Sequence, residues 1–252
     1  MNSKIKTSVV LFGILEESSD NYRKLSTKSL GVLLVKNGDL YSLPEYYSDL
    51  PLDLDKQSLL AVETSTGLKD LYVEQLYTFS SVKDDVLHIN PSFLGLISKE
   101  EMYEGLKDNC YWCELKIEEK DDGYKCKIIN EKDILEFIVS KKLKEHTTDR
   151  YKFSEVNNGM LMDGVSITLM SAFERLRNKV NYTDIVFNMM GDTFTLKELQ
   201  HVYEAIENKK LLDAAFRRII AGKVEETNEV LTGLGCRPSK IYRYKEKKQW
   251  KN

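Results

Sequence analysis

Residues 46–68 read YYSDLPLDLDKQSLLAVETSTGL, and this stretch decides the fold. Positions 61, 64 and 65 are spaced i, i+3 and i+4, so on a short helix they share one face. Three carboxylates on such a face could hold divalent cations. Here the three residues are Ala61, Thr64 and Ser65, which supply none. Glu63 is the only carboxylate on that turn, and it points about 100° or more away from the shared face.

The surrounding sequence predicts strands. Residues 7–12 and 29–36 are β-branched and aliphatic runs of strand length, and the second ends at Asn37-Gly38-Asp39, a turn signal. Residues 68–79 resemble the strand that follows the corresponding helix in the Nudix-related transcriptional regulators, and this resemblance implies a further strand here.

The frame of residues 46–68 resembles the Nudix box, G-x5-E-x7-R-E-U-x-E-E-x-G-U, where U is aliphatic. The alignment needs no gaps: Leu43-Pro44-Glu45-Tyr46 stands where the family has Leu-Pro-Gly-Gly, and Val62, Gly67 and Leu68 are kept. Leu60 replaces the arginine of the motif and Leu52 its earlier glutamate. The resemblance implies a Nudix-like α/β/α sandwich that no longer hydrolyses its substrate, with no catalytic residue, no metal site and no cofactor.

The C-terminal part predicts a helix-turn-helix followed by a wing. Residues 194–206 open with a capping box from Thr195 to Glu198. A second helix is predicted over residues 212–221, with Asp213 as its N-cap and Gly222 as its stop. Residues 223–227 and 240–244 predict two strands joined by a glycine-containing loop. Apolar residues follow the first helix at helical spacing: Leu196, Leu199, Val202, Tyr203 and Ile206.

Charge is distributed unevenly along the chain. Residues 192–252 carry 13 Lys and Arg against 9 Asp and Glu, a net charge of +4, whereas residues 1–191 carry 24 against 31, a net charge of −7. An acidic body with a basic end is typical of a sensor domain joined to a nucleic-acid-binding module.

Taken together, these features resemble the Nudix-related transcriptional regulators, which fuse an often inactive Nudix domain to a C-terminal winged helix. The resemblance implies an α+β fold, with a sensor domain and linking helix over residues 1–180 and a winged helix-turn-helix over residues 181–252. It implies a homodimeric repressor that binds a palindromic double-stranded DNA operator near genes of NAD metabolism. ADP-ribose, or another nucleotide or sugar phosphate, would be the effector that releases it.

Residues of the wing match the family's G-R-P-x-K segment and the strand after it, with Cys236 in place of the glycine. We expect DNA contacts from the second helix and the wing. The expected residues are Arg217, Arg218, Arg237, Ser239, Lys240, Tyr242 and Arg243. The start of the second helix departs from the usual pattern, because Asp213, Ala214 and Ala215 stand where polar or basic residues normally read bases.

Effector contacts are expected from Glu45, Tyr46, Glu63 and Tyr77. Glu45 and Tyr46 replace glycines, so they add bulk and a negative charge where a diphosphate would lie. This leaves the chemistry of the effector open.

Residues 164–179 predict an amphipathic linking helix with Ile167, Met170, Phe173 and Leu176 facing inward. Residues 112–117 and 124–129 predict a hairpin around the turn at 118–123. Its cysteines, Cys110, Cys113 and Cys126, are expected to be reduced and partly buried, since a zinc site needs four ligands.

Two other functions stay open at the level of sequence. One is a nucleotide hydrolase using Asp53, Asp55 and Glu63, and the other is a non-enzymatic protein-interaction module. No apolar run approaches 18 residues and no signal peptide is apparent, so we expect a cytoplasmic protein with no membrane partner.

Overall fold

The computed structural model describes residues 3–17, 27–47, 51–69, 71–143, 151–157, 159–232 and 238–245. Within these ranges ten strands form one mixed sheet, in which β1 and β6 are parallel and the other pairings antiparallel. The main order is β10-β9-β8-β7-β2-β1-β6-β5, with β3 beside β2 and β4 beside β1. The strands are β1 (Ser3–Glu17), β2 (Thr27–Asn37), β3 (Leu40–Ser42), β4 (Glu45–Tyr47), β5 (Tyr72–Lys83), β6 (Val86–Leu96), β7 (Cys110–Lys120), β8 (Gly123–Ile129), β9 (Ile134–Leu143) and β10 (Tyr151–Asn157).

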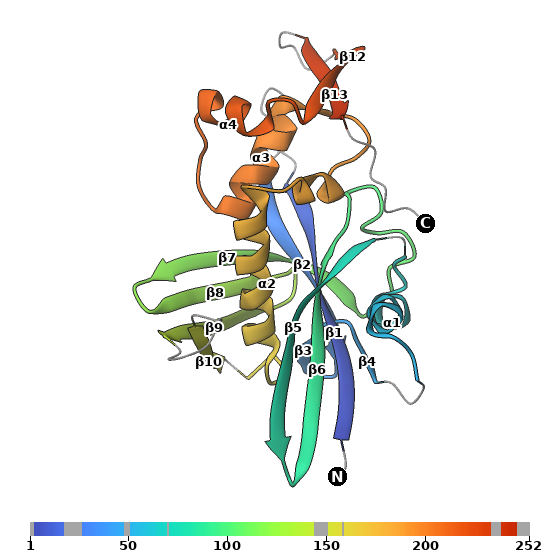
Figure 1. Ribbon diagram of the computed structural model, residues 1–252, viewed down its shortest axis with the longest axis vertical. Helices are drawn as coiled ribbons and strands as arrows, with labels where there is room; N and C mark the ends of the chain where they lie inside the picture. The colour runs from blue at the N-terminus through green and yellow to red at the C-terminus, as the bar shows by residue number, and fades with distance from the viewer. Residues whose placement is uncertain are drawn as a thin grey trace.

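Helices cover both faces of this sheet, which gives the three layers that the resemblance to the Nudix family implies (Figure 1). Alternate residues of β1 point to opposite faces. Val10 and Phe12 enter the larger core, on which α2 (Val165–Val180) packs. Val9 and Leu11 enter a smaller core closed by α1 (Leu54–Thr66).

The two predicted opening strands and the turn after the second are confirmed by β1, β2 and the positive φ of Gly38. The strand predicted over residues 68–79 is shifted, because β5 begins only at Tyr72. The predicted hairpin is also present, but β7 runs on to Lys120 and the turn shrinks to residues 121–122.

The linking helix is confirmed as α2, and Met170, Phe173 and Leu176 are buried as predicted. Ile167 is only half-buried, which corrects its assignment to the inward face. The larger core does not stop where α2 ends: it continues through the 3-10 helix η1 (Ile185–Met189) into the C-terminal helices. Because one core spans both parts, the predicted domain boundary at residue 180 stays a prediction.

The C-terminal part forms a helix-turn-helix with a small sheet at the far end of the molecule (Figure 1). Its elements are β11 (Phe194–Thr195), α3 (Leu196–Glu207), α4 (Asp213–Ile220), β12 (Val224–Leu231) and β13 (Ser239–Tyr244). The capping box of Thr195 and Glu198 is confirmed. Asp213 is not the N-cap of α4: Leu212 holds that position, and Asp213 is the first helical residue.

Candidate nucleic-acid interface and effector site

The exposed side of α4 presents two arginines. Phe216 and Ile220 fix the helix, since both side chains are buried and the Phe216 ring packs edge-on against Tyr203 of α3, with ring centroids 5.7 Å apart. Arg217 and Arg218 lie on the exposed side of α4. A helix anchored on one side and basic on the other can contact phosphates or base edges in a groove.

The wing beside α4 carries further cations, each held by an acidic residue of the opposite strand. Lys240 Nζ lies 2.8 Å from Glu226 Oε1, and Arg243 Nε lies 2.5 Å from Glu225 Oε1. These pairs are solvent-exposed, so they hold the side chains only weakly and DNA phosphates can compete for them.

Other predicted wing residues lie in different settings. Ser239 is exposed and Tyr242 half-buried, with its hydroxyl donating to Glu226 at 3.5 Å. Arg237 lies outside the described residues, as does most of the loop between β12 and β13.

A polar network that the sequence did not reveal orients α4. Gln200 of α3 is buried, and its amide nitrogen donates to the Leu211 carbonyl at 2.9 Å and to Asp213 Oδ1 at 3.1 Å. The neighbouring Glu204 is also buried and accepts from Lys210 and from the Leu211 amide. Burial raises the pKa of Glu204, but these two donors outweigh it and lower the pKa below its usual value. The Asp213 carboxylate therefore lies toward α3.

The face of α1 that would carry box carboxylates is partly buried and holds none. Ala61 is fully buried, whereas Thr64 is exposed and its hydroxyl donates back to the Leu60 carbonyl. Ser65 donates to the Glu45 carbonyl at 3.0 Å and accepts from the Glu45 amide at 3.2 Å, so its side chain fastens α1 to β4. Gly67, the glycine kept from the Nudix box, ends α1 in a conformation that requires glycine. Its φ is +87°, and a Cβ there would lie 2.2 Å from the Gly105 carbonyl oxygen.

The four predicted effector residues do not form one cluster. Glu45 lines a pocket on the α2 side of the sheet, and Tyr46 packs against the smaller core on the α1 side. Adjacent strand residues face opposite ways, which explains the separation. Glu63 pairs with Lys69 at 2.9 Å on the surface. Tyr77 of the edge strand β5 pairs in register with Ser92, which places it on the same sheet face as the pocket.

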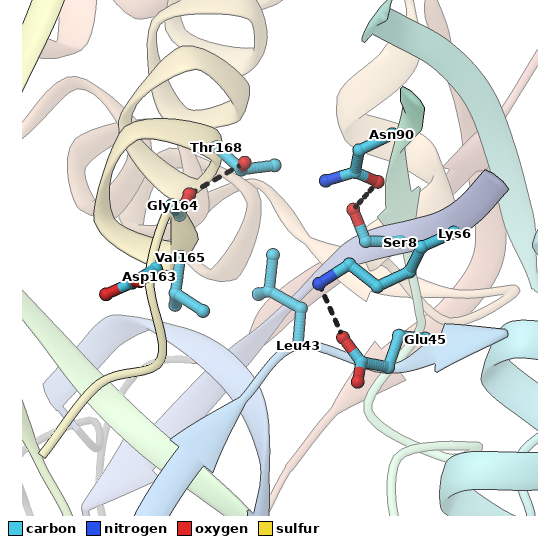
Figure 2. A pocket seen from close by; sticks show the side chains of 9 residues that line it. All are labelled: Lys6, Ser8, Leu43, Glu45, Asn90, Asp163, Gly164, Val165 and Thr168. Atoms are coloured by element: carbon cyan, nitrogen blue, oxygen red, sulfur yellow. Dashed lines mark hydrogen bonds and ion pairs between the residues drawn. The ribbon is translucent and has the colours of Figure 1, made fainter. Parts of the chain in front are cut away.

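The pocket lies between the sheet and the start of α2, and Figure 2 shows its side chains. Strands β1, β4 and β6 form one wall, and the first turn of α2 forms the other. Lys6 Nζ lies 3.0 Å from Glu45 Oε2, and Ser8 donates to Asn90 Oδ1 at 3.0 Å. Its lining residues are Lys6, Ser8, Leu43, Glu45, Asn90, Asp163, Gly164, Val165 and Thr168. The sequence pointed only to Glu45, because the other residues come from distant segments.

No metal centre is indicated among the residues that the structure describes. The described residues contain no group of three or more His, Cys, Asp or Glu arranged to hold a metal ion. Cys110, Cys113 and Cys126 are buried and free, as expected. Burial raises the pKa of Cys113 to about 11 and that of Cys126 to about 12, so both thiols stay protonated. No helix in the described ranges is long and apolar enough to cross a bilayer.

Comparison with known sequences finds a match to a known domain family in the C-terminal part of the chain. Residues 186–244 match the NrtR DNA-binding winged helix domain. The chain is 45% identical over 78 residues to a protein of Acinetobacter baylyi named ADPR responsive transcriptional repressor NtrR. That alignment spans 30% of this chain and 31% of the relative, so the chain matches about a third of the relative's length.

Two solved structures share the fold over nearly the whole chain. Shewanella oneidensis NrtR in complex with a 27mer DNA superposes with a TM-score of 0.63 and 20% identity, covering 96% of this chain and 93% of that one. A MutT/nudix family protein from Enterococcus faecalis superposes with a TM-score of 0.67 and 19% identity, covering 97% and 87%. The chain therefore shares the fold of these two structures, and its residues 186–244 match the NrtR DNA-binding winged helix domain.

Proposed function

We propose that this protein is a transcriptional repressor whose winged helix binds a double-stranded DNA operator. The observation that carries the proposal is that Arg217 and Arg218 on α4 and the cations of the adjacent wing are all exposed. They lie in the segment that matches the NrtR DNA-binding winged helix domain. Arg217, Arg218, Ser239, Lys240, Tyr242 and Arg243 would make the contacts, together with Arg237. A homodimer on a palindromic operator would place two such surfaces on successive half-sites.

The Nudix-fold part would act as the sensor. The A. baylyi relative is named as ADPR responsive, which supports ADP-ribose as the effector of this chain. The pocket beside Glu45 is the candidate site, with Tyr77 on the same face of the sheet. Tyr46 and Glu63 would influence binding only indirectly from where they lie.

The sensor would bind its effector without hydrolysing it. Ala61, Thr64 and Ser65 supply no carboxylate to hold a cation against a diphosphate. Asp53, the first of the alternative carboxylates, accepts from the Lys56 amide at 2.8 Å as the N-cap of α1, which is a structural use of its side chain.

A gel shift with the DNA upstream of the protein's own gene tests the proposal. We expect a retarded complex that a scrambled duplex of equal length does not form, and that ADP-ribose dissolves. Equal retardation of both duplexes, or of neither, would favour the protein-interaction module instead. A complex that forms but ignores ADP-ribose would keep the DNA-binding function and refute the effector.

A further inference from the structure

The start of α4 exposes a large apolar side chain. Leu212 is 80% exposed, more than any other large apolar side chain in the part of the chain that the structure describes. A single exposed leucine is ordinary on a protein surface. This one, however, begins the helix that presents the exposed Arg217 and Arg218. In a helix-turn-helix, the N-terminal residues of the second helix are the ones that reach base edges in the major groove.

The side chain of Leu212 contributes little to the stability of the fold. Leu212 is the N-cap of α4, and its side chain makes no capping hydrogen bond. By contrast, Asp53 and Thr195 at the N-caps of α1 and α3 each accept a hydrogen bond from a backbone amide of their helix. Serine, threonine, aspartate or asparagine at an N-cap stabilises a helix relative to an apolar residue. Because Leu212 neither caps α4 nor is buried, its side chain is available for an external contact.

The neighbouring side chains allow this end of α4 to approach the floor of a groove. Ala214 is exposed and short. The Asp213 carboxylate accepts a hydrogen bond from Gln200 of α3 at 3.1 Å. Ala214, Arg217 and Arg218 are spaced i, i+3 and i+4, so they share one face of α4, and Arg218 Nε donates to the Ala214 carbonyl at 3.4 Å. An apolar start followed by two cations matches a floor of base edges bordered by phosphates.

We propose that Leu212 reads thymine methyl groups in the major groove and so determines which operator the protein prefers. The C5-methyl group of thymine is an apolar feature of the major-groove edge, and apolar side chains recognise it by contact. A leucine side chain has no hydrogen-bonding group, so its contribution to specificity depends on the presence of this methyl group. The inference rests on the proposed function. It gives a role to the apolar start of α4, where polar or basic residues normally read bases.

Fluorescence anisotropy with two matched duplexes tests the inference. Both duplexes carry the DNA upstream of the protein's own gene, one made with thymidine and the other with deoxyuridine, which lacks only the methyl group. We expect the native chain to bind the thymidine duplex at least about fourfold more tightly, which is the effect of burying one methyl group. Leu212→Ser should bind the two duplexes within about twofold of each other.

Leu212→Ser also separates base reading from a structural role, because serine is a favoured N-cap residue. The melting temperature of this variant should equal or exceed that of the native chain. Leu59→Ser is the matched control, since Leu59 is an exposed leucine of α1, 45% accessible. It should keep the preference of the native chain for the thymidine duplex.

The possible failures are distinguishable. Equal affinity of the native chain for both duplexes would overturn the inference, would leave the repressor function standing and would favour a protein partner for Leu212. An unchanged preference in Leu212→Ser would also overturn it, because other residues would then read the methyl groups. Binding of neither duplex by the native chain would refute the repressor function and the inference with it.

Discussion

At the scale of single residues, the face of α1 formed by positions 61, 64 and 65 carries no carboxylate. Ala61 is fully buried, and the Ser65 hydroxyl donates a hydrogen bond to the Glu45 carbonyl. Both side chains therefore help to pack α1 against the sheet. The hydrolase alternative would need Asp53, Asp55 and Glu63. These do not share a helical face, and in the structure Asp53 and Glu63 are paired with Lys56 and Lys69.

We predict that ADP-ribose incubated with the protein and magnesium or manganese stays intact. Chromatography of the products should show turnover below about 0.1 per second, a slow rate by general enzyme standards. Glu63→Ala should give the same result as the native chain. Faster metal-dependent cleavage that Glu63→Ala abolishes would show that the protein is a hydrolase after all.

A carboxylate placed at position 61, where the Nudix box has one, should destabilise the protein. Ala61→Glu places a charged group among the buried residues of the smaller core, including Val62 and Leu68. We expect it to lower the free energy of unfolding by about 3 kcal/mol, measured by denaturant titration. The exposed Thr64→Glu should change stability little, and equal stability of the two variants would contradict the packing described for α1.

At the scale of elements, the wing is a two-stranded ribbon whose cations are paired across it. Glu225 lies opposite Arg243 in the register of β12 and β13, and Lys240 contacts Glu226. Phosphate binding would exchange an intramolecular carboxylate for a phosphate, and the exposed pairs would cost little to open.

We predict that Lys240→Ala flattens the dependence of log affinity on log salt by about one unit, because one phosphate contact and its released counterions are lost. Glu226→Gln should strengthen operator binding, since it frees Lys240. Fluorescence anisotropy across a salt series measures both. Lys116→Ala on β7, a paired and exposed lysine of the ten-stranded sheet, serves as control. If the slope of log affinity against log salt is unchanged in Lys240→Ala, Lys240 does not contact DNA phosphates and the assignment of the wing to the DNA interface is wrong.

At the scale of the whole molecule, α2 ties the edge of the sheet to the helix-turn-helix. Lys179, near its end, lies 2.5 Å from Glu74 of β5, and Arg175 donates to the Leu76 carbonyl at 3.2 Å. The same strand carries Tyr77 on the pocket face. Asn181 then donates to Glu207 of α3 at 2.7 Å. A displacement of β5 by an effector would thus reach α3, the first helix of the helix-turn-helix, through side chains already in contact.

We predict reciprocal coupling: saturating operator should weaken ADP-ribose binding by the same factor by which ADP-ribose weakens operator binding. Glu74→Gln should reduce that factor several-fold while each ligand alone binds within about twofold of the native value. Titration calorimetry with and without operator measures it. Glu114→Gln removes a comparable ion pair with Lys116 on β7 and should leave the factor unchanged. If both variants couple as the native chain does, the contact between β5 and α2 does not transmit the signal.

The sequence by itself determined the features that depend on near neighbours. The capping box of α3, the turn at Gly38 and the missing carboxylates on α1 follow from residues within one or two turns of one another, and the local pattern fixes them. Tertiary structure decided what depends on strand register. It put Glu45 and Tyr46 on opposite faces and brought Lys6 and Asn90 to one pocket with the start of α2. Register is set by long-range pairing, and a slip of one residue would send each of these side chains to the other face.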